Sequence, residues 1–290
     1  MRSYLKLILS MLIWGSLALF VAPLPYSSAE IVLWRIVLGF LSLTVIFIIG
    51  KRPLHTVALK KYGLRLVLTG VAMGLNWMAL FEAYRYVDIS IATLAYYCAP
   101  ILVMLGSVLL YREKFTSTKL FGMATAVAGM IIVTGAQLGG SDPLRGVLLG
   151  LLSASLYACV TLSNKGVQGL SGLEITITQL LGAFLVVCPW VLLTHTGSWN
   201  FPGGIDLLRL LTLGLIHTGL ALFLYFSSIQ ELSAQTAALC SYIDPASALL
   251  FAALFLHESL TPKQLIGAVL ILGGALLGEL PGKHSRKGAV

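Results

Sequence analysis

The chain has 290 residues, of which 58% are hydrophobic and 10% are charged, and its mean hydropathy is +0.94. Soluble domains carry about 45–50% apolar and about 25% charged residues, so this composition excludes a soluble globular protein. The formal net charge of +8 does not indicate nucleic-acid binding, because the placement of the basic residues marks membrane topology, as shown below.

Apolar segments long enough to cross a bilayer, which takes about 20 residues, follow one another along the chain. In the first half they lie near residues 4–22, 30–49, 65–84, 90–110 and 119–136. In the second half they lie near residues 146–164, 174–194, 209–228, 235–256 and 263–279. The sequence therefore predicts an all-α integral membrane protein with ten transmembrane helices and no extramembrane domain.

The first segment imitates a signal peptide, but no small-residue cleavage pattern follows it, so we expect an uncleaved first span. The four cysteines all lie in apolar segments without metal-ligand spacing, which predicts neither a disulfide framework nor a metal site. No P-loop, HExxH or G-x-S-x-G motif is present, so we expect no enzyme activity and no cofactor.

The Lys and Arg residues are distributed unequally between the two sides of this predicted bundle. The side of the termini holds Arg2, Lys6, Lys51, Arg52, Lys60, Lys61, Arg65, Arg112, Lys114, Lys119, Lys165, Lys283, Arg286 and Lys287. The opposite side holds Arg85, Arg145, Arg209 and Lys263. Cytoplasmic loops are enriched in Lys and Arg, so this distribution predicts cytoplasmic termini and a cytoplasmic tail over 280–290.

An internal repeat relates the two halves. A shift of 145 residues places Ala92, Pro100, Glu113, Thr116, Gly122 and Gly129 on Ala237, Pro245, Glu258, Thr261, Gly267 and Gly274. Five spans separate equivalent positions, so the halves, residues 4–136 and 146–279, are inserted in opposite senses. Inverted repeats of this kind are typical of secondary transporters, whose site lies between the halves near the bilayer midplane.

The repeated proline, the E-x-x-T after it and the glycine-spaced final helix resemble the EamA branch of the drug/metabolite transporter superfamily over essentially the whole chain. Trp14-Gly15 and Trp34-Arg35 also match its first-repeat pattern. The resemblance implies a basket of ten helices that exports small metabolites across the cytoplasmic (inner) membrane, including amino acids in the aromatic-exporter members. The second half departs from the first, because an offset of 144 residues places Gln179, and not a counterpart of Arg35, at the equivalent position.

Ionisable groups inside spans are costly and normally face a cavity or a partner. Arg35 is the candidate for binding a substrate carboxylate, the alternative being a fixed ion pair or a side chain that reaches the interface. Asp244, directly before the helix-loosening Pro245, is the candidate for a proton or cation site, the alternative being a permanent pair with Arg35. His217 is a candidate proton carrier, against a neutral histidine bonded to a neighbouring helix.

Polar and aromatic residues away from the span ends are expected to line the cavity, and such a lining suits a substrate with an apolar body and one or two charges. These residues are Trp14, Asn76, Trp77, Tyr96, Tyr97, Ser153, Tyr157, Gln179, Tyr225, Ser241 and Tyr242. Pro100, Pro245, Glu113 and Glu258 are expected to be architectural, and Glu82 and Arg85 to form a surface pair.

The sequence thus predicts an exporter of small amphipathic metabolites, in first place amino acids with large apolar or aromatic side chains. Export of drugs or other metabolites and a lipid flippase or scramblase are the alternatives. The expected partners are a small-molecule substrate and membrane lipids. The glycine-rich spans 119–136 and 263–279 are expected to pack either the two halves or two copies of the chain, as a homodimer.

The predicted orientation can be tested by cysteine labelling in intact cells. A cysteine at position 55, in the predicted inner loop 51–65, should stay unreactive toward an impermeant maleimide added outside. A cysteine at position 209, on the other side, is the control and should react. Labelling of position 55 from outside would overturn the orientation.

Overall fold

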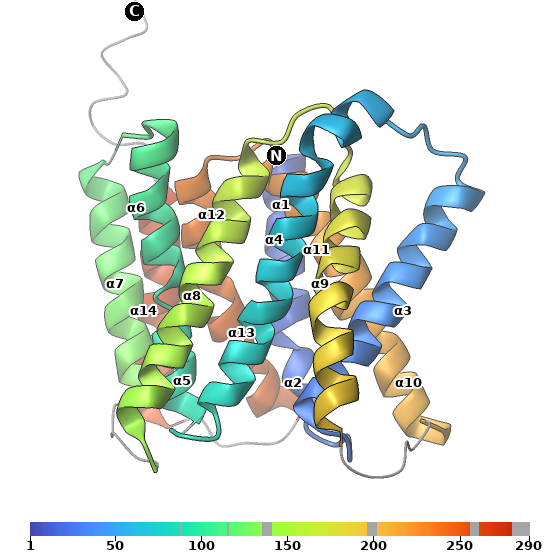
Figure 1. Cartoon of the computed structure of the whole chain (residues 1–290). Helices are drawn as coiled ribbons and strands as arrows, with labels where there is room; N and C mark the ends of the chain where they lie inside the picture. Colours follow the sequence, from blue (N-terminus) through green and yellow to red (C-terminus); the bar gives the residue numbers. More distant parts are fainter. Residues whose placement is uncertain (88, 115, 135–140, 196–201, 256–260, 280–290) are drawn as a thin grey trace, which may run out of the picture.

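The computed structural model describes residues 1–87, 89–114, 116–134, 141–195, 202–255 and 261–279. Within these ranges every regular element is a helix, and most helices run up and down through one bundle (Figure 1). In the first half they are α1 (Arg2–Gly15), α2 (Leu17–Val21), α3 (Ser28–Ile49), α4 (Thr56–Ala83), α5 (Ile89–Tyr96), α6 (Ala99–Tyr111) and α7 (Ser117–Thr134).

The second half begins with α8 (Pro143–Lys165), α9 (Gly172–Thr194) and α10 (Gly204–Thr212). A π-helix, η1 (Leu213–Leu220), continues α10 and leads into α11 (Ala221–Ile229). The chain then forms α12 (Ala234–Cys240), α13 (Ile243–Phe255) and α14 (Pro262–Glu279).

Eight segments in the described part of the chain are long and apolar enough to cross a membrane. They are Arg2–Val21, Ser28–Ile49, Thr56–Ala83, Ile91–Tyr111, Pro143–Lys165, Gly172–Thr194, Gly204–Ile229 and Ala234–Phe255. Two shorter apolar helices, α7 and α14, occupy the expected fifth and tenth positions. The chain is therefore an all-helical, multi-pass membrane protein.

The third span is longer than the sequence predicts. Its helix begins at Thr56, whereas the apolar pattern indicates a start near residue 65. Lys60 and Lys61 interrupt the apolar run but not the helix, because lysine is a good helix former. The predicted inner loop 51–65 is correspondingly shorter.

The fourth and ninth spans break at equivalent positions. The fourth breaks at Tyr97 and Cys98, between α5 and α6, and the ninth breaks at Ser241 and Tyr242, between α12 and α13. Each break lies just before a proline, which lacks an amide hydrogen and clashes with the carbonyl four residues back. The loosening of the helix that Pro245 predicts is confirmed by this break, and its counterpart in the other half shows the same inverted-repeat construction.

A second repeated feature begins the second and seventh spans. Ser27 and Glu30 form a capping box at the start of α3, and Ser171 and Glu174 form one at the start of α9. In each, the serine hydroxyl accepts from the glutamate amide while the glutamate carboxylate accepts from the serine amide, which satisfies two helix-end donors. A shift of 144 residues relates the two boxes.

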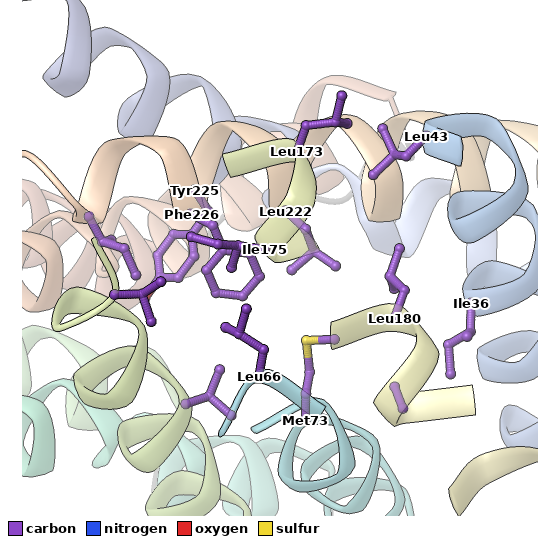
Figure 2. Packing of buried hydrophobic residues seen from close by; sticks show 14 of the residues in the cluster. Ile36, Leu43, Leu66, Met73, Leu173, Ile175, Leu180, Leu222, Tyr225 and Phe226 are labelled. Atoms are coloured by element: carbon purple, nitrogen blue, oxygen red, sulfur yellow. The ribbon is translucent and has the colours of Figure 1, made fainter. Parts of the chain in front are cut away.

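The main hydrophobic core joins the two halves. Figure 2 shows Leu66 and Met73 of α4 packing near Ile175 and Leu180 of α9, with Phe226 of α11 beside them. The core runs along the bundle, from Leu170 and Leu173 near the end where α1 begins, which we call the N-terminal end, to Val191 in the last turn of α9. The opposite end is where α4 ends and α5 begins.

Helices α7 and α14 pack against each other, which brings the last spans of the two halves together. A Cβ atom at Gly274 would lie 2.5 Å from the Gly122 carbonyl oxygen, and one at Gly129 would lie 2.6 Å from the Gly267 carbonyl oxygen. The close approach predicted for these glycines therefore occurs between the two halves of one chain.

Neighbouring glycines of α14 provide a matched test of this contact. Gly274→Ala should cost about 1–3 kcal/mol because the new methyl group overpacks the α7 interface. Gly273→Ala should leave stability unchanged or raise it, since a Cβ there has no atom within 4 Å. Thermal melting in detergent checks both, and equal melting temperatures for the two variants would contradict this packing.

Candidate functional site

A cavity of about 350 Å³ lies between the two halves. Helices α1 to α6 line it from the first half, and α8, η1, α11 and α13 line it from the second. Both helix breaks reach it, through Tyr97 and Ser241. Its α4 residues lie in the half of that helix nearest α5, and Arg35 lies near the start of α3, so the cavity extends toward the end opposite the N-terminal end.

Arg35, two turns into α3, is 7% exposed and faces this cavity. Its Nε donates to Oγ1 of Thr218 at 3.0 Å, and its guanidinium lies 5.5 Å from the centre of the Trp77 ring. Its two Nη atoms have no hydrogen bond or ion pair to any residue that the structure describes. The fork that can bind a carboxylate through two parallel bonds is thus left unused.

Asp244 is the second residue of α13 and lines the same cavity. Over the described residues its carboxylate makes no hydrogen bond and no ion pair. Tyr96, Tyr97 and Tyr157 line the cavity together with Asp244. Its place in the first turn of a helix favours a negative charge, because the amide groups there point toward it.

Arg35 and Asp244 do not pair with each other, although they line one cavity. The permanent pair that the sequence left open is therefore absent from this conformation. A buried charge without a partner is costly, so both groups are positioned to bind complementary charges that enter the cavity.

His217 lies in the π-helix and is 2% exposed. Its Nδ1 lies 3.3 Å from the Thr212 carbonyl oxygen, which assigns a proton to that nitrogen, and its Nε2 lies 3.0 Å from Oγ of Ser16. Its backbone carbonyl accepts from Nε1 of Trp14 at 2.9 Å. His217 therefore connects η1 to the junction of α1 and α2, in the bonded arrangement that the sequence left as the alternative to a proton carrier.

Four aromatic residues, Trp14, Tyr96, Tyr157 and Tyr225, form what we call the aromatic floor of the cavity. Ring centres lie 5.3 Å apart for Trp14 and Tyr225, 5.9 Å for Tyr96 and Tyr157, and 6.2 Å for Tyr157 and Tyr225. The Tyr157 hydroxyl donates to that of Tyr225 at 2.8 Å. The floor offers stacking surface to an apolar substrate group, while the polar atoms of Trp14, Tyr157 and Tyr225 are hydrogen-bonded within the protein.

Polar contacts between the halves close the N-terminal end beneath the floor. The Glu113 carboxylate accepts from the amides of Ala234 and Gln235, at 2.9 and 3.2 Å, and lies 3.4 Å from Lys165 Nζ. Tyr111 donates to the Leu162 carbonyl in the same region. Glu113 thus caps the broken ninth span from the other half, which is the geometry of an architectural residue.

The structure brings most of the predicted site residues together. Those that line the cavity are Trp14, Arg35, Asn76, Trp77, Tyr96, Tyr97, Pro100, Tyr157, His217, Tyr225, Ser241 and Asp244. Ser153, Gln179, Tyr242, Pro245 and Glu113 are not among the lining residues. Glu258 lies outside the described residues.

Gln179 and Ser153 have partners within the protein. Gln179 is fully buried, and its Nε2 donates to Thr69 Oγ1 at 2.8 Å and to Asn164 Oδ1 at 2.7 Å. The Ser153 hydroxyl donates to the Asn76 carbonyl at 3.0 Å. The bonds from Gln179 to Thr69 and from Ser153 to Asn76 join helices of opposite halves, whereas the bond to Asn164 joins α9 to α8 within the second half. On the surface, Arg85 and Glu82 pair at 3.3 Å, as their spacing predicts.

Sequence reasoning missed several lining residues, including Met73 and Phe81 of α4 and Tyr84 directly after it. They lie three, four or seven positions from Asn76 and Trp77, so helical periodicity from those two would have found them. Thr218 carried no such signal, because its contact with Arg35 depends on the π-helix.

The EamA-like transporter family matches the chain twice, over residues 1–135 and 144–278. The uncharacterized transporter YxxF of Bacillus subtilis is 27% identical over 94% of this chain and 88% of its own length. Protein PecM of Dickeya dadantii is 25% identical over 76% of this chain and 75% of its own. A solved crystal structure, 17% identical, aligns with a TM-score of 0.82 over 96% of this chain and 98% of that chain, which is a likeness of fold.

Proposed function

The chain belongs to the EamA-like transporter family, and we propose that it exports a small amphipathic metabolite, in first place an amino acid with a large apolar or aromatic side chain. The observation that supports this proposal is the cavity between the halves, in which Arg35 and Asp244 face the same space without pairing. Secondary transporters place their substrate site at the interface of inverted repeats, beside discontinuous helices.

The proposed topology has ten crossings of the inner membrane, with α7 and α14 as the fifth and tenth and both termini in the cytoplasm. The basic residues of the N-terminal end support this orientation. The described cavity then faces the exterior, while the contacts around Glu113 close the cytoplasmic side. In alternating access these contacts would open when substrate enters from the cytoplasm.

The chemistry of the cavity supports the substrate class. Arg35 offers a carboxylate site, and the aromatic floor and Trp77 offer contact for an apolar side chain. The volume of about 350 Å³ lies at the lower end of small-molecule sites, about 300–1,000 Å³. A small metabolite fits this volume better than a phospholipid with two acyl chains, so the observation favours solute export over the flippase alternative.

Arg35 can be tested by a conservative change. Arg35→Lys keeps the charge but loses the planar fork, so it should weaken binding of L-phenylalanine about tenfold or more while the protein stays folded. Arg85→Lys, in the surface pair with Glu82, is the matched control and should bind as the unmutated chain does. Titration of the purified protein with the amino acid measures both, and unchanged binding by Arg35→Lys and Arg35→Ala would remove Arg35 from the site.

Asp244 is proposed as the coupling residue, which takes up a proton on one side of the membrane and releases it on the other. Asp244→Asn should abolish the dependence of flux on a proton gradient in proteoliposomes while leaving exchange at equal concentrations intact. Asp206→Asn, in the surface pair with Arg209, is the matched control and should stay gradient-dependent.

A purely structural role for Asp244 predicts a different result, because poor expression or loss of both activities together would follow from its replacement. Gradient-driven flux at the unmutated rate in Asp244→Asn would contradict both accounts. It would assign coupling to another group, with His217 next, or make the protein a uniporter.

A further inference from the structure

The eighth span contains a local change of helix type beside the candidate site. Residues Leu213–Leu220 form a π-helix, whose backbone bonds join residues five apart, between the α-helical segments α10 and α11. Single π-turns inside α-helices are rare and are frequently found at functional sites. The π-helix of the eighth span reaches the cavity through His217.

Comparison of the two halves shows which difference in sequence accompanies the π-turn. In the third span, Gly70 and Gly74 are four residues apart and pack on α9, where Cβ atoms would approach the Gln179 backbone and, at 3.2 Å, the Ala183 carbonyl. In the eighth span, Gly214 and Gly219 are five residues apart and pack on α3, against Leu38 and, at 3.3 Å, Ser42.

The residue offset between the halves changes across these glycines. Gly70 and Gly214 differ by 144 positions, and Gly74 and Gly219 differ by 145. The second half therefore contains one extra residue between its two packing glycines. The π-turn accommodates this residue, because groups five apart in a π-helix share a face as groups four apart do in an α-helix.

The widened turn has two contacts that reach cavity residues of the first half. The His217 carbonyl accepts from the indole nitrogen of Trp14 at 2.9 Å. The Thr218 hydroxyl accepts from Nε of Arg35 at 3.0 Å and donates to the Leu213 carbonyl at 2.9 Å, across the π-turn. In the equivalent helix pair, Gln179 is buried against Thr69 and Asn164 and does not reach the cavity.

The hydrogen bond that Arg35 Nε donates to Thr218 Oγ1 fixes the direction of the guanidinium. Because the single hydroxyl hydrogen of Thr218 is used on Leu213, a lone pair is held toward Nε. A guanidinium carries five N–H groups in a rigid fork, so holding Nε leaves the four on the Nη atoms available together. The ring of Trp77 lies against the same group and further restricts it.

We propose that the one-residue insertion in the eighth span makes Thr218 the positioning residue for Arg35, and that Thr218 thereby gives the cavity its selectivity for a carboxylate over its neutral amide. This inference rests on the proposed function, in which Arg35 binds the substrate carboxylate. It assigns to Thr218 a role in orientation, without contact to the substrate.

The test compares two ligands that differ only in the carboxylate, L-phenylalanine and L-phenylalaninamide, by titration of tryptophan fluorescence in the purified full chain. Thr218→Val should weaken binding of the amino acid at least tenfold and change binding of the amide less than twofold. Thr218→Ser, which restores the hydroxyl, should return both affinities to within twofold of the unmutated chain. Thr218→Ala is measured in parallel, so that the result does not depend on the folding of one variant.

Thr212→Val is the matched control, because among the residues that the structure describes the Thr212 hydroxyl bonds only the Leu208 carbonyl, in its own helix. It should leave both affinities unchanged. Equal losses for the two ligands in Thr218→Val, or no loss for either, would overturn the positioning role while leaving the proposed function in place. An unmutated chain that binds the amino acid no more tightly than the amide would instead overturn the carboxylate site itself, and this inference with it.

Discussion

A charged side chain inside a membrane protein normally needs a complementary charge or hydrogen-bonding groups. Here two side chains of opposite charge, Arg35 and Asp244, line one cavity without pairing. Arg35 reaches it from α3 and Asp244 from the first turn of α13, so each belongs to a different half of the chain. The cost of leaving either charge unpaired is several kcal/mol in a dry interior. The surrounding structure keeps them apart, and a dipolar solute or a proton is what would relieve that cost.

The frame around these charges is symmetric, whereas the site is not. Capping boxes, proline breaks and packing glycines recur in both halves, so the same backbone is built twice in opposite senses. At equivalent positions, however, Gln179 is bonded within the protein and Arg35 faces the cavity. One extra residue in the eighth span accompanies this difference. In the proposed alternating-access cycle, the symmetric frame would supply the two closures, and the asymmetric residues would supply recognition.

Much of the fold follows from the sequence, because apolar runs, prolines and charge bias are local signals. The break near Ser241 was predictable from Pro245, whereas the early start of α4 was not, since Lys60 and Lys61 end the apolar run without ending the helix. Arg35 and Asp244 stand out as charges in apolar segments. Gln179 resembles a lining residue in sequence, because its partners Thr69 and Asn164 lie on other helices, where no local pattern indicates them. The contact between Thr218 and Arg35 depends on the π-turn, and no local sequence pattern predicts that turn.

Counterflow in proteoliposomes tests the central claim that this cavity carries a small zwitterionic solute. Vesicles loaded with unlabelled L-phenylalanine and diluted into labelled amino acid should accumulate label transiently above its external concentration. This overshoot should disappear in vesicles that hold Arg35→Ala. Equal uptake with and without the internal amino acid, across a panel of amino acids, would contradict the account, as would passage of labelled phospholipid between leaflets in the absence of any solute exchange.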